Sequence, residues 1–168
     1  CVVPFFGRYY AAIVNLDILI SGDSEGRIMM PVLCDFIQIV GDSAVAIGDP
    51  PAHTVWEANF NTGGRRSAST AFLLFNVKGL TYTDKNVAVK VNNKRVGYIY
   101  RYGGLTGTDK DQMANHWYTQ MIAFNGSDLK DGNNEVQIEA VTFPGSGGNN
   151  VYDDFYIKNM VCFFHQSA

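Results

Sequence analysis

The sequence predicts an all-β fold, a β-sandwich or a barrel, and three observations point to it. Apolar side chains recur at every second position in many short segments, which is the period of a strand with one buried face. Segments rich in Gly, Asn, Asp, Ser and Pro separate these strands at regular spacing. Aromatic residues are abundant, with 11 Phe and 9 Tyr beside 17 Gly, a composition typical of strands joined by tight turns.

The N-terminal part of the chain predicts a strand-like arm that precedes the main domain. Within residues 11–21, AAIVNLDILIS, one apolar stripe at period two is formed by Val14, Leu16, Ile18 and Ile20. The segment SGDSEG at 21–26 is a turn cluster. We therefore divide the chain into an N-terminal arm or edge strand, residues 1–26, and a β-sandwich domain, residues 27–168.

The domain contains further strands, each bounded by turn signals. Because proline interrupts a central strand, Pro31 places the first of them at residues 32–40. Further strand segments are expected within residues 43–53, 54–61, 69–80, 87–101, 116–124, 133–143 and 155–165. We expect eight to ten strands and no helix longer than a turn or two. Long polar segments occupy residues 102–115 and 144–154, and loops of this length in compact domains are usually functional or mobile.

Residues 87–101 predict a β-hairpin. If Asn93-Lys94 forms its two-residue turn, the facing pairs are Val91 with Val96, Val89 with Tyr98, and Val87 with Tyr100. This register predicts that Tyr98 and Tyr100 lie in the core beside the valines.

Length and charge limit the classes of function. The 168 residues fit one domain, and 46% of them are hydrophobic, which is enough for a packed core. The formal net charge is −3 and the basic residues are scattered, so that sequence-independent binding of nucleic acid is not expected. Residues 1–20 are rich in apolar groups, but Arg8, Asn15 and Asp17 interrupt them, so we expect no transmembrane segment.

The three cysteines, Cys1, Cys34 and Cys162, form no CxxC pair, so that a zinc or redox motif has no support. Cys34 and Cys162 lie in apolar strand-like segments, and we expect both to be buried free thiols. A bridge between these two stays possible if the protein is exported.

Several segments of the second half carry a more specific pattern. In order, they are FLLFNVKGL, VAVKVNNKRVGYI, HWYTQMIAF, DLKDGNNEVQIEAV and DDFYIKNMVCFF. This series resembles the galactose-binding-domain-like β-sandwiches, the jelly rolls common among carbohydrate-binding modules. A pattern of this group, L-x-x-G-x-N-x-[IV]-x-[IL], is matched by Leu129, Gly132, Asn134, Val136 and Ile138. The resemblance covers roughly residues 55–168.

The resemblance implies an antiparallel jelly-roll β-sandwich, to which the residue pattern adds the N-terminal strand-like arm of residues 1–26. The roles that it gives to the motif residues are structural. Gly132 permits a tight turn, the Asn134 side chain bonds to neighbouring backbone, and Val136 and Ile138 face the core. The function that it implies is glycan recognition without catalysis, and hence an extracellular or cell-surface location.

A sugar site needs an aromatic face for the apolar side of the ring, with polar groups for its hydroxyls. The two long polar segments bring suitable residues together if they converge. The candidate ligand-binding residues are Arg101, Tyr102, Asn115, His116, Trp117, Asn149, Asn150 and Tyr152. Core burial is the competing interpretation for Trp117, because its period-two phase matches Met121. Tyr102 and Tyr152 are expected to be the better exposed aromatic residues.

No catalytic constellation is evident. The histidines, His53, His116 and His165, lie outside any nucleophile motif, and PGSGG at 144–148 lacks the strand-to-helix context of a nucleophile elbow. We therefore do not expect an enzyme. Asp153 and Asp154 are adjacent, so that their side chains should point to opposite faces of a strand. The resemblance adds a possible structural calcium ion, for which Asp153 and Asp154 are candidate ligands.

An alternative function comes from another class. The apolar arm presents an unpaired strand-like edge, and such an edge usually pairs with something. The sandwich is then a structural unit that forms homo-oligomers through residues 1–20.

Overall fold

A computed structural model of the chain describes residues 32–64, 66–81, 85–102, 115–145 and 148–167. The predicted arm at residues 1–26 lies outside this part. The strands are β1 (Val32–Gln38), β2 (Val45–Ile47), β3 (Val55–Asn61), β4 (Thr70–Lys78), β5 (Val87–Val91), β6 (Lys94–Ile99), β7 (Tyr118–Asn125), β8 (Asn133–Glu139), β9 (Thr142–Pro144), β10 (Asn150–Tyr152) and β11 (Phe155–Ser167). One 3₁₀ helix, η1 (Gly126–Asp128), follows β7.

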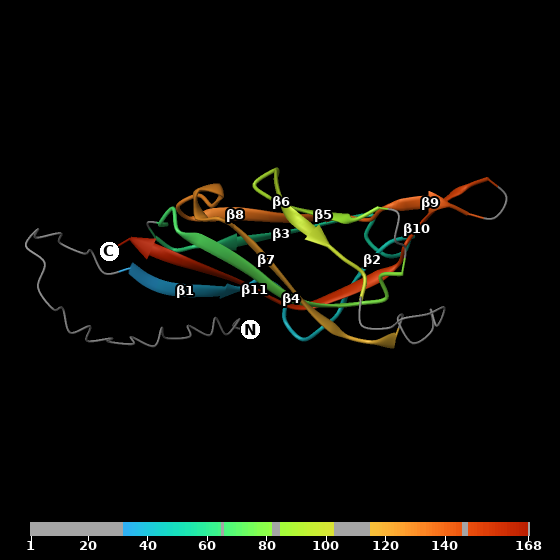
Figure 1. The fold of residues 1–168 in the computed structure, drawn as a ribbon, viewed down its shortest axis with the longest axis horizontal. Coiled ribbons are helices and arrows are strands. Elements are labelled where there is room, and N and C mark those ends of the chain that lie inside the picture. The colour runs from blue at the N-terminus through green and yellow to red at the C-terminus, as the bar shows by residue number, and fades with distance from the viewer. Residues whose placement is uncertain (1–31, 65, 82–84, 103–114, 146–147, 168) are drawn as a thin grey trace, which may run out of the picture.

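The strands form two facing antiparallel sheets, which confirms the predicted all-β sandwich (Figure 1). The larger sheet has the order β1-β11-β4-β7, and β2 also pairs with β11. The smaller sheet has the order β3-β8-β5-β6. Strands β9 and β10 form a separate hairpin at one end of the sandwich. No helix among the described residues has the length and hydrophobicity needed to cross a membrane.

The core lies between the sheets and follows the period-two pattern of the sequence. In β4 the side chains of Leu73, Phe75 and Val77 are buried, whereas those between them are half-buried on the opposite face. The smaller sheet contributes buried residues in the same alternation, namely Trp56, Phe60, Val87, Val89, Val91, Val136 and Ile138. Burial of such side chains contributes about 1.5 to 3 kcal/mol each.

The alternation changes phase in β11. Asn159 adopts a left-handed backbone conformation with φ of 53°, and the register with β4 shifts between Lys158 and Val161. This β-bulge inserts one extra residue. As a result Ile157 and Met160, three positions apart, both point into the core.

The predicted register of the hairpin is wrong. Its turn is Asn92-Asn93, with φ of 50° and 66°, and Val91 pairs with Lys94. Two positive φ values define a type I′ turn, which asparagine tolerates better than lysine does. With a further irregularity between Val89 and Lys90, Ile99 is the buried residue of β6, whereas Tyr100 is 52% exposed.

The cysteines of the described part are both free, but only Cys162 is buried. The expectation of two buried thiols is therefore wrong for Cys34, which is exposed. Burial raises the pKa of the Cys162 thiol to about 12.

Cys34 should be alkylated by iodoacetamide in the folded protein, and Cys162 only after unfolding, because the thiolate is the nucleophile and must be accessible. Mass spectrometry of tryptic peptides measures the two rates separately. Equal rates under native conditions would contradict the buried position of Cys162, and a urea-unfolded sample provides the control for intrinsic reactivity.

Candidate functional site

The predicted site residues come to one end of the sandwich but not to one place. The end of β4 and the beginnings of β7 and β11 meet there, since Val77 pairs with Tyr118 and Lys78 with Tyr156. The hairpin of β9 and β10 lies at the same end (Figure 1). The residues lie in three kinds of place. These are a tyrosine–histidine cluster, formed by Tyr102, His116 and Tyr118, an exposed sheet face, and two pockets.

Tyr102 belongs to the tyrosine–histidine cluster, and its ring packs against neighbouring rings instead of projecting into solvent. Its ring lies 5.1 Å from that of His116 and 5.4 Å from that of Tyr118, centroid to centroid. The Tyr118 hydroxyl donates to the Tyr100 carbonyl oxygen at 2.6 Å. Burial, with a smaller contribution from the charge of Asp153, raises the pKa of Tyr118. Tyr118 is thus a structural support for Tyr102, while the neighbouring Arg101 is exposed.

Trp117 points the other way, out of the core. The buried residues at the inner face of β7 are Ile122 and Phe124, whereas Met121 is 63% exposed. The period-two match with Met121 therefore places Trp117 outside, and the competing interpretation of core burial is wrong. The Trp117 side chain is half-buried, because the lysines of neighbouring strands cover part of it.

We use the term outer face for the side of the larger sheet that points away from the smaller sheet. Strand pairing orders its side chains into rows that cross β11, β4 and β7. At the loop end, one row contains Tyr156, Lys78 and Trp117, and the next contains Lys158, Asn76 and Thr119. Strands far apart in the sequence thus place two aromatic rings and several polar groups on one surface.

Two ammonium groups lie over the Trp117 ring. The Lys158 Nζ is 4.9 Å and the Lys78 Nζ 5.8 Å from its centroid. Lys158 also forms an ion pair of 3.1 Å with Asp42. This hydrogen bond and charge lower the pKa of the exposed Asp42 carboxyl.

Amide groups continue this polar surface away from the ring. The Asn76 Nδ2 donates to the Thr119 Oγ1 at 3.0 Å, and the Asn159 Nδ2 donates to the Asn76 Oδ1 at 3.3 Å. The hydroxyl and amides beside the ring are groups that can both donate and accept.

Tyr152 lines a different surface, next to the smaller sheet. It borders a pocket of about 280 Å³ whose polar lining residues are Lys85, Asn86, Glu139 and Thr142. The Lys85 Nζ donates to the Thr142 carbonyl oxygen at 3.0 Å. Asn149 and Asn150 are exposed at the start of β10 and do not line this pocket. The Tyr152 ring packs partly against the core, so this pocket offers a smaller aromatic surface than the outer face does.

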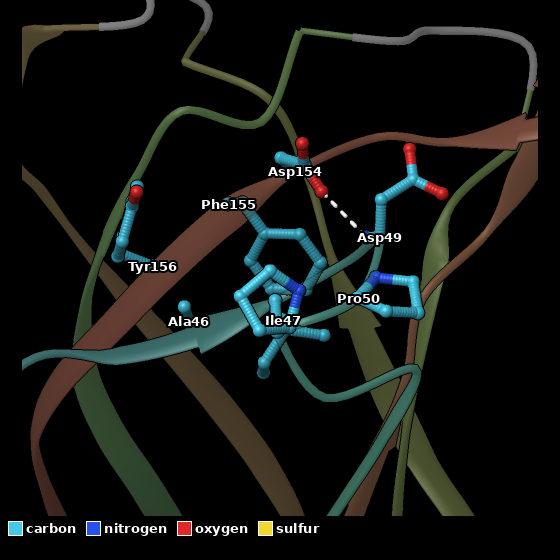
Figure 2. A pocket seen from close by; sticks show the side chains of 9 residues that line it. Ala46, Ile47, Asp49, Pro50, Asp154, Phe155 and Tyr156 are labelled. Carbon is cyan, nitrogen blue, oxygen red and sulfur yellow. Dashed lines mark hydrogen bonds between the residues drawn. The ribbon is translucent and has the colours of Figure 1, made fainter.

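Asp153 and Asp154 point in opposite directions, as their adjacency predicts. Asp153 is buried, and its two carboxylate oxygens accept from the Thr81 backbone N–H and hydroxyl at 2.9 and 3.0 Å. Asp154 is exposed and accepts from the Asp49 N–H at 2.6 Å. In Figure 2 Asp49 and Asp154 stand over a pocket floored by Ile47, Phe155 and Pro50.

This second pocket has a volume of about 270 Å³, and Tyr156 forms one of its walls. It therefore adjoins the row that contains Lys78 and Trp117. Among the described residues, no group of three or more His, Cys, Asp or Glu is arranged to hold a metal ion.

The sequence interpretation missed the residues that surround Trp117. Lys78, Lys158 and Tyr156 each alternate with buried residues of β4 or β11, so that an outward direction is readable from period two. What the sequence does not contain is the pairing of β4 with both β11 and β7, which brings them together.

No protein-family model matches the sequence, and no curated protein matches it. Three solved structures show what the chain is similar to. A β-porphyranase of glycoside hydrolase family 86 from the human gut bacterium Bacteroides plebeius matches 82% of this chain at 16% identity, with a TM-score of 0.49, and the chain spans 21% of that enzyme.

The other two are carbohydrate-binding modules. A family 35 module from Clostridium thermocellum matches 73% of this chain and 97% of its own length at 16% identity, with a TM-score of 0.39. A family 36 module, solved in complex with calcium and xylotriose, matches 79% of this chain and 99% of its own length at 12% identity, with a TM-score of 0.36.

Proposed function

We propose that this protein binds glycans without catalysis and that the sugar stacks on Trp117. The observation that carries the proposal is the position of this ring on an open sheet face, next to Lys78, Asn76 and Thr119. The apolar side of a sugar ring packs on an aromatic face, while its hydroxyls need donors and acceptors at the edge. This surface offers both.

The lysines over the ring do not block such a ligand. A cation–π contact at an exposed site contributes about 0.5 to 1 kcal/mol, and a lysine side chain has a flexible stem. A sugar that displaces Lys78 and Lys158 from the ring face leaves their ammonium groups at its edge, where they donate to ring or hydroxyl oxygens. The contact that is lost is therefore replaced by hydrogen bonds.

The remaining predicted residues fit this proposal in different ways. His116 and Asn115 are exposed directly before Trp117, and we propose that they extend the site toward the tyrosine–histidine cluster. Tyr152 lines a separate pocket, and Asn149 and Asn150 are exposed a few residues before it. We propose this region as a secondary contact for a longer ligand.

Trp117→Ala should weaken binding of any glycan found on an array by about 30-fold, or about 2 kcal/mol, the loss typical of a central aromatic contact. Titration calorimetry measures the affinity, and far-ultraviolet circular dichroism shows that the variant is folded. Tyr100→Ala is the matched control, since it removes an exposed aromatic residue that directly follows β6 of the smaller sheet. Unchanged affinity of the Trp117 variant, or no ligand on neutral and acidic arrays, would refute the proposal.

Association between copies of the chain stays a second candidate function. Residues 1–20, on which it was based, lie outside the described residues. A second observation comes from the described residues. The half of the outer face away from the loop end is apolar and exposes Phe36, Met121 and Phe163. Sedimentation velocity tests this function, and a single monomeric species at high concentration would exclude it.

Two further predictions accompany the proposal. A calcium ion takes six to eight oxygen ligands, and Asp49 and Asp154 supply only part of such a set, because both oxygens of Asp153 already accept hydrogen bonds. The structural calcium ion therefore stays a prediction. An extracellular or cell-surface location also stays a prediction, which follows from the proposed ligand.

A further inference from the structure

We infer that the ligand is a linear glycan of at least three sugar units, which lies across strands β11, β4 and β7 and rests on Tyr156 as well as Trp117. The inference rests on the proposed function and adds the length and direction of the ligand. It depends on the row that contains Tyr156, Lys78 and Trp117.

Tyr156 is a second aromatic surface on the outer face. Its strand neighbours Phe155 and Ile157 are fully buried, whereas Tyr156 is 41% exposed. Strand alternation therefore directs its ring outward, to the same side as Trp117. It pairs directly with Lys78, which in turn lies beside Trp117.

The distance between the two rings sets the size of the ligand. β4 separates β11 from β7, so that the backbones that carry Tyr156 and Trp117 are two strand spacings apart, or about 9.6 Å. One sugar ring cannot touch both side chains, whereas three linked rings place one unit on each aromatic ring and one unit between them. The direction of such a ligand is across the strands rather than along them.

Lys78 occupies the position between the two rings. Among the described residues it forms no ion pair, and its Nζ lies 5.8 Å from the centroid of the Trp117 ring. Its ammonium group is thus available to donate to oxygens of the sugar between the two stacked units. The row thus presents an aromatic ring, an ammonium group and a second aromatic ring in sequence. This arrangement suits a linear glycan whose outer two sugar units stack and whose middle unit forms hydrogen bonds.

The row continues beyond Tyr156 into the pocket of Figure 2. Tyr156 and Ala46, which pair across β11 and β2, both line it together with Asp49 and Asp154. Carboxylates accept strongly from hydroxyl groups. The pocket therefore receives the next sugar of a chain that already lies on Trp117 and Tyr156.

Affinity should then depend on ligand length. The probes are oligosaccharides of two to six units from xylan, mannan, cellulose and agarose, titrated calorimetrically into the whole chain. For a series that binds, the association constant should rise at least about tenfold from two to four units and then level off. Tyr156→Ala should remove this rise and leave the affinity for two units within about twofold, whereas Tyr156→Phe retains it.

The controls separate this inference from the proposed function. Trp117→Ala should weaken binding at every length, and Tyr100→Ala at none. Length-independent affinity, or a rise with length that persists in Tyr156→Ala, would overturn the inference while leaving the Trp117 site standing. Failure of all four series to bind the wild-type protein overturns both.

Discussion

Replacing Asn134 with leucine should lower the free energy of unfolding by about 3 to 4 kcal/mol. Asn134 is 2% exposed, and its side chain makes four hydrogen bonds. The Oδ1 accepts from the Lys130 N–H at 2.7 Å and from the Asn92 Nδ2 at 2.8 Å. The Nδ2 donates to the carbonyl oxygens of Lys130 at 3.0 Å and Gly132 at 2.8 Å.

The cost arises because these four hydrogen bonds are partly buried, so that water does not fully replace the lost amide. A leucine has the same branched arrangement of heavy atoms and gains apolar contact, but it leaves the Lys130 N–H without its acceptor, and a buried unsatisfied group costs about 1 to 3 kcal/mol. Thr62 also donates to the carbonyls of Lys130 and Gly132, so that the acceptors are affected less than the donors.

Urea denaturation measures this loss, and the preceding residue in β8 provides the control. Asn133 is exposed, and its Oδ1 accepts from the Asn61 Nδ2 at 2.7 Å. Asn133→Leu should cost less than about 1 kcal/mol, since water replaces the lost partner. Equal losses for the two variants would mean that the buried network does not hold the turn before β8.

The motif around Asn134 shows what the sequence predicts well. The motif resemblance implied a turn glycine, a backbone-bonding asparagine and two core residues, and the structure has all of them. Gly132 has φ of 87°, Asn134 bonds to the backbone, and Val136 and Ile138 are fully buried. These roles are local, since each depends on residues within a few positions or on period-two alternation.

Errors arose where two local interpretations competed. In the hairpin, Asn92-Asn93 and Asn93-Lys94 both offer a two-residue turn, and only the tolerance of both central residues for positive φ decides between them. In β7, Met121 and Ala123 on one face compete with Ile122 and Phe124 on the other. Ile122 and Phe124, the larger pair, face the core. Trp117, which has the phase of Met121 and Ala123, therefore points outward.

The candidate site could be predicted only in part, because its polar groups come from distant strands. Lys78 and Lys158 are 80 positions apart in the sequence and meet over Trp117 through the order β11-β4-β7. The period-two pattern predicts the face of the sheet on which each residue lies. The local sequence does not predict which strands pair with each other in the sheet. The same reason explains why Tyr156 was not a candidate.

Gly126→Ala should destabilise the protein by about 3 kcal/mol, more than an added methyl group usually costs. A Cβ at Gly126 would lie 2.2 Å from the Ser69 carbonyl oxygen and 2.5 Å from that of Ser67. Both obstacles are backbone atoms, so that no rotamer change relieves them. The Gly126 N–H also donates to the Ser69 oxygen at 3.0 Å, and separating the two segments breaks this bond.

Gly132→Ala separates this steric effect from backbone strain. Gly132 has positive φ, but a Cβ there would meet nothing within 4 Å. The variant should therefore cost only about 1 to 2 kcal/mol, the penalty of a left-handed conformation. If Gly126→Ala costs no more than Gly132→Ala in thermal and urea unfolding, the close approach of the β3–β4 connection to η1 is not as tight as the structure has it. A larger loss at Gly126 instead shows that the contact of η1 with Ser67 and Ser69 stabilises the end of the β4–β7 pair that lies farthest from Lys78 and Trp117.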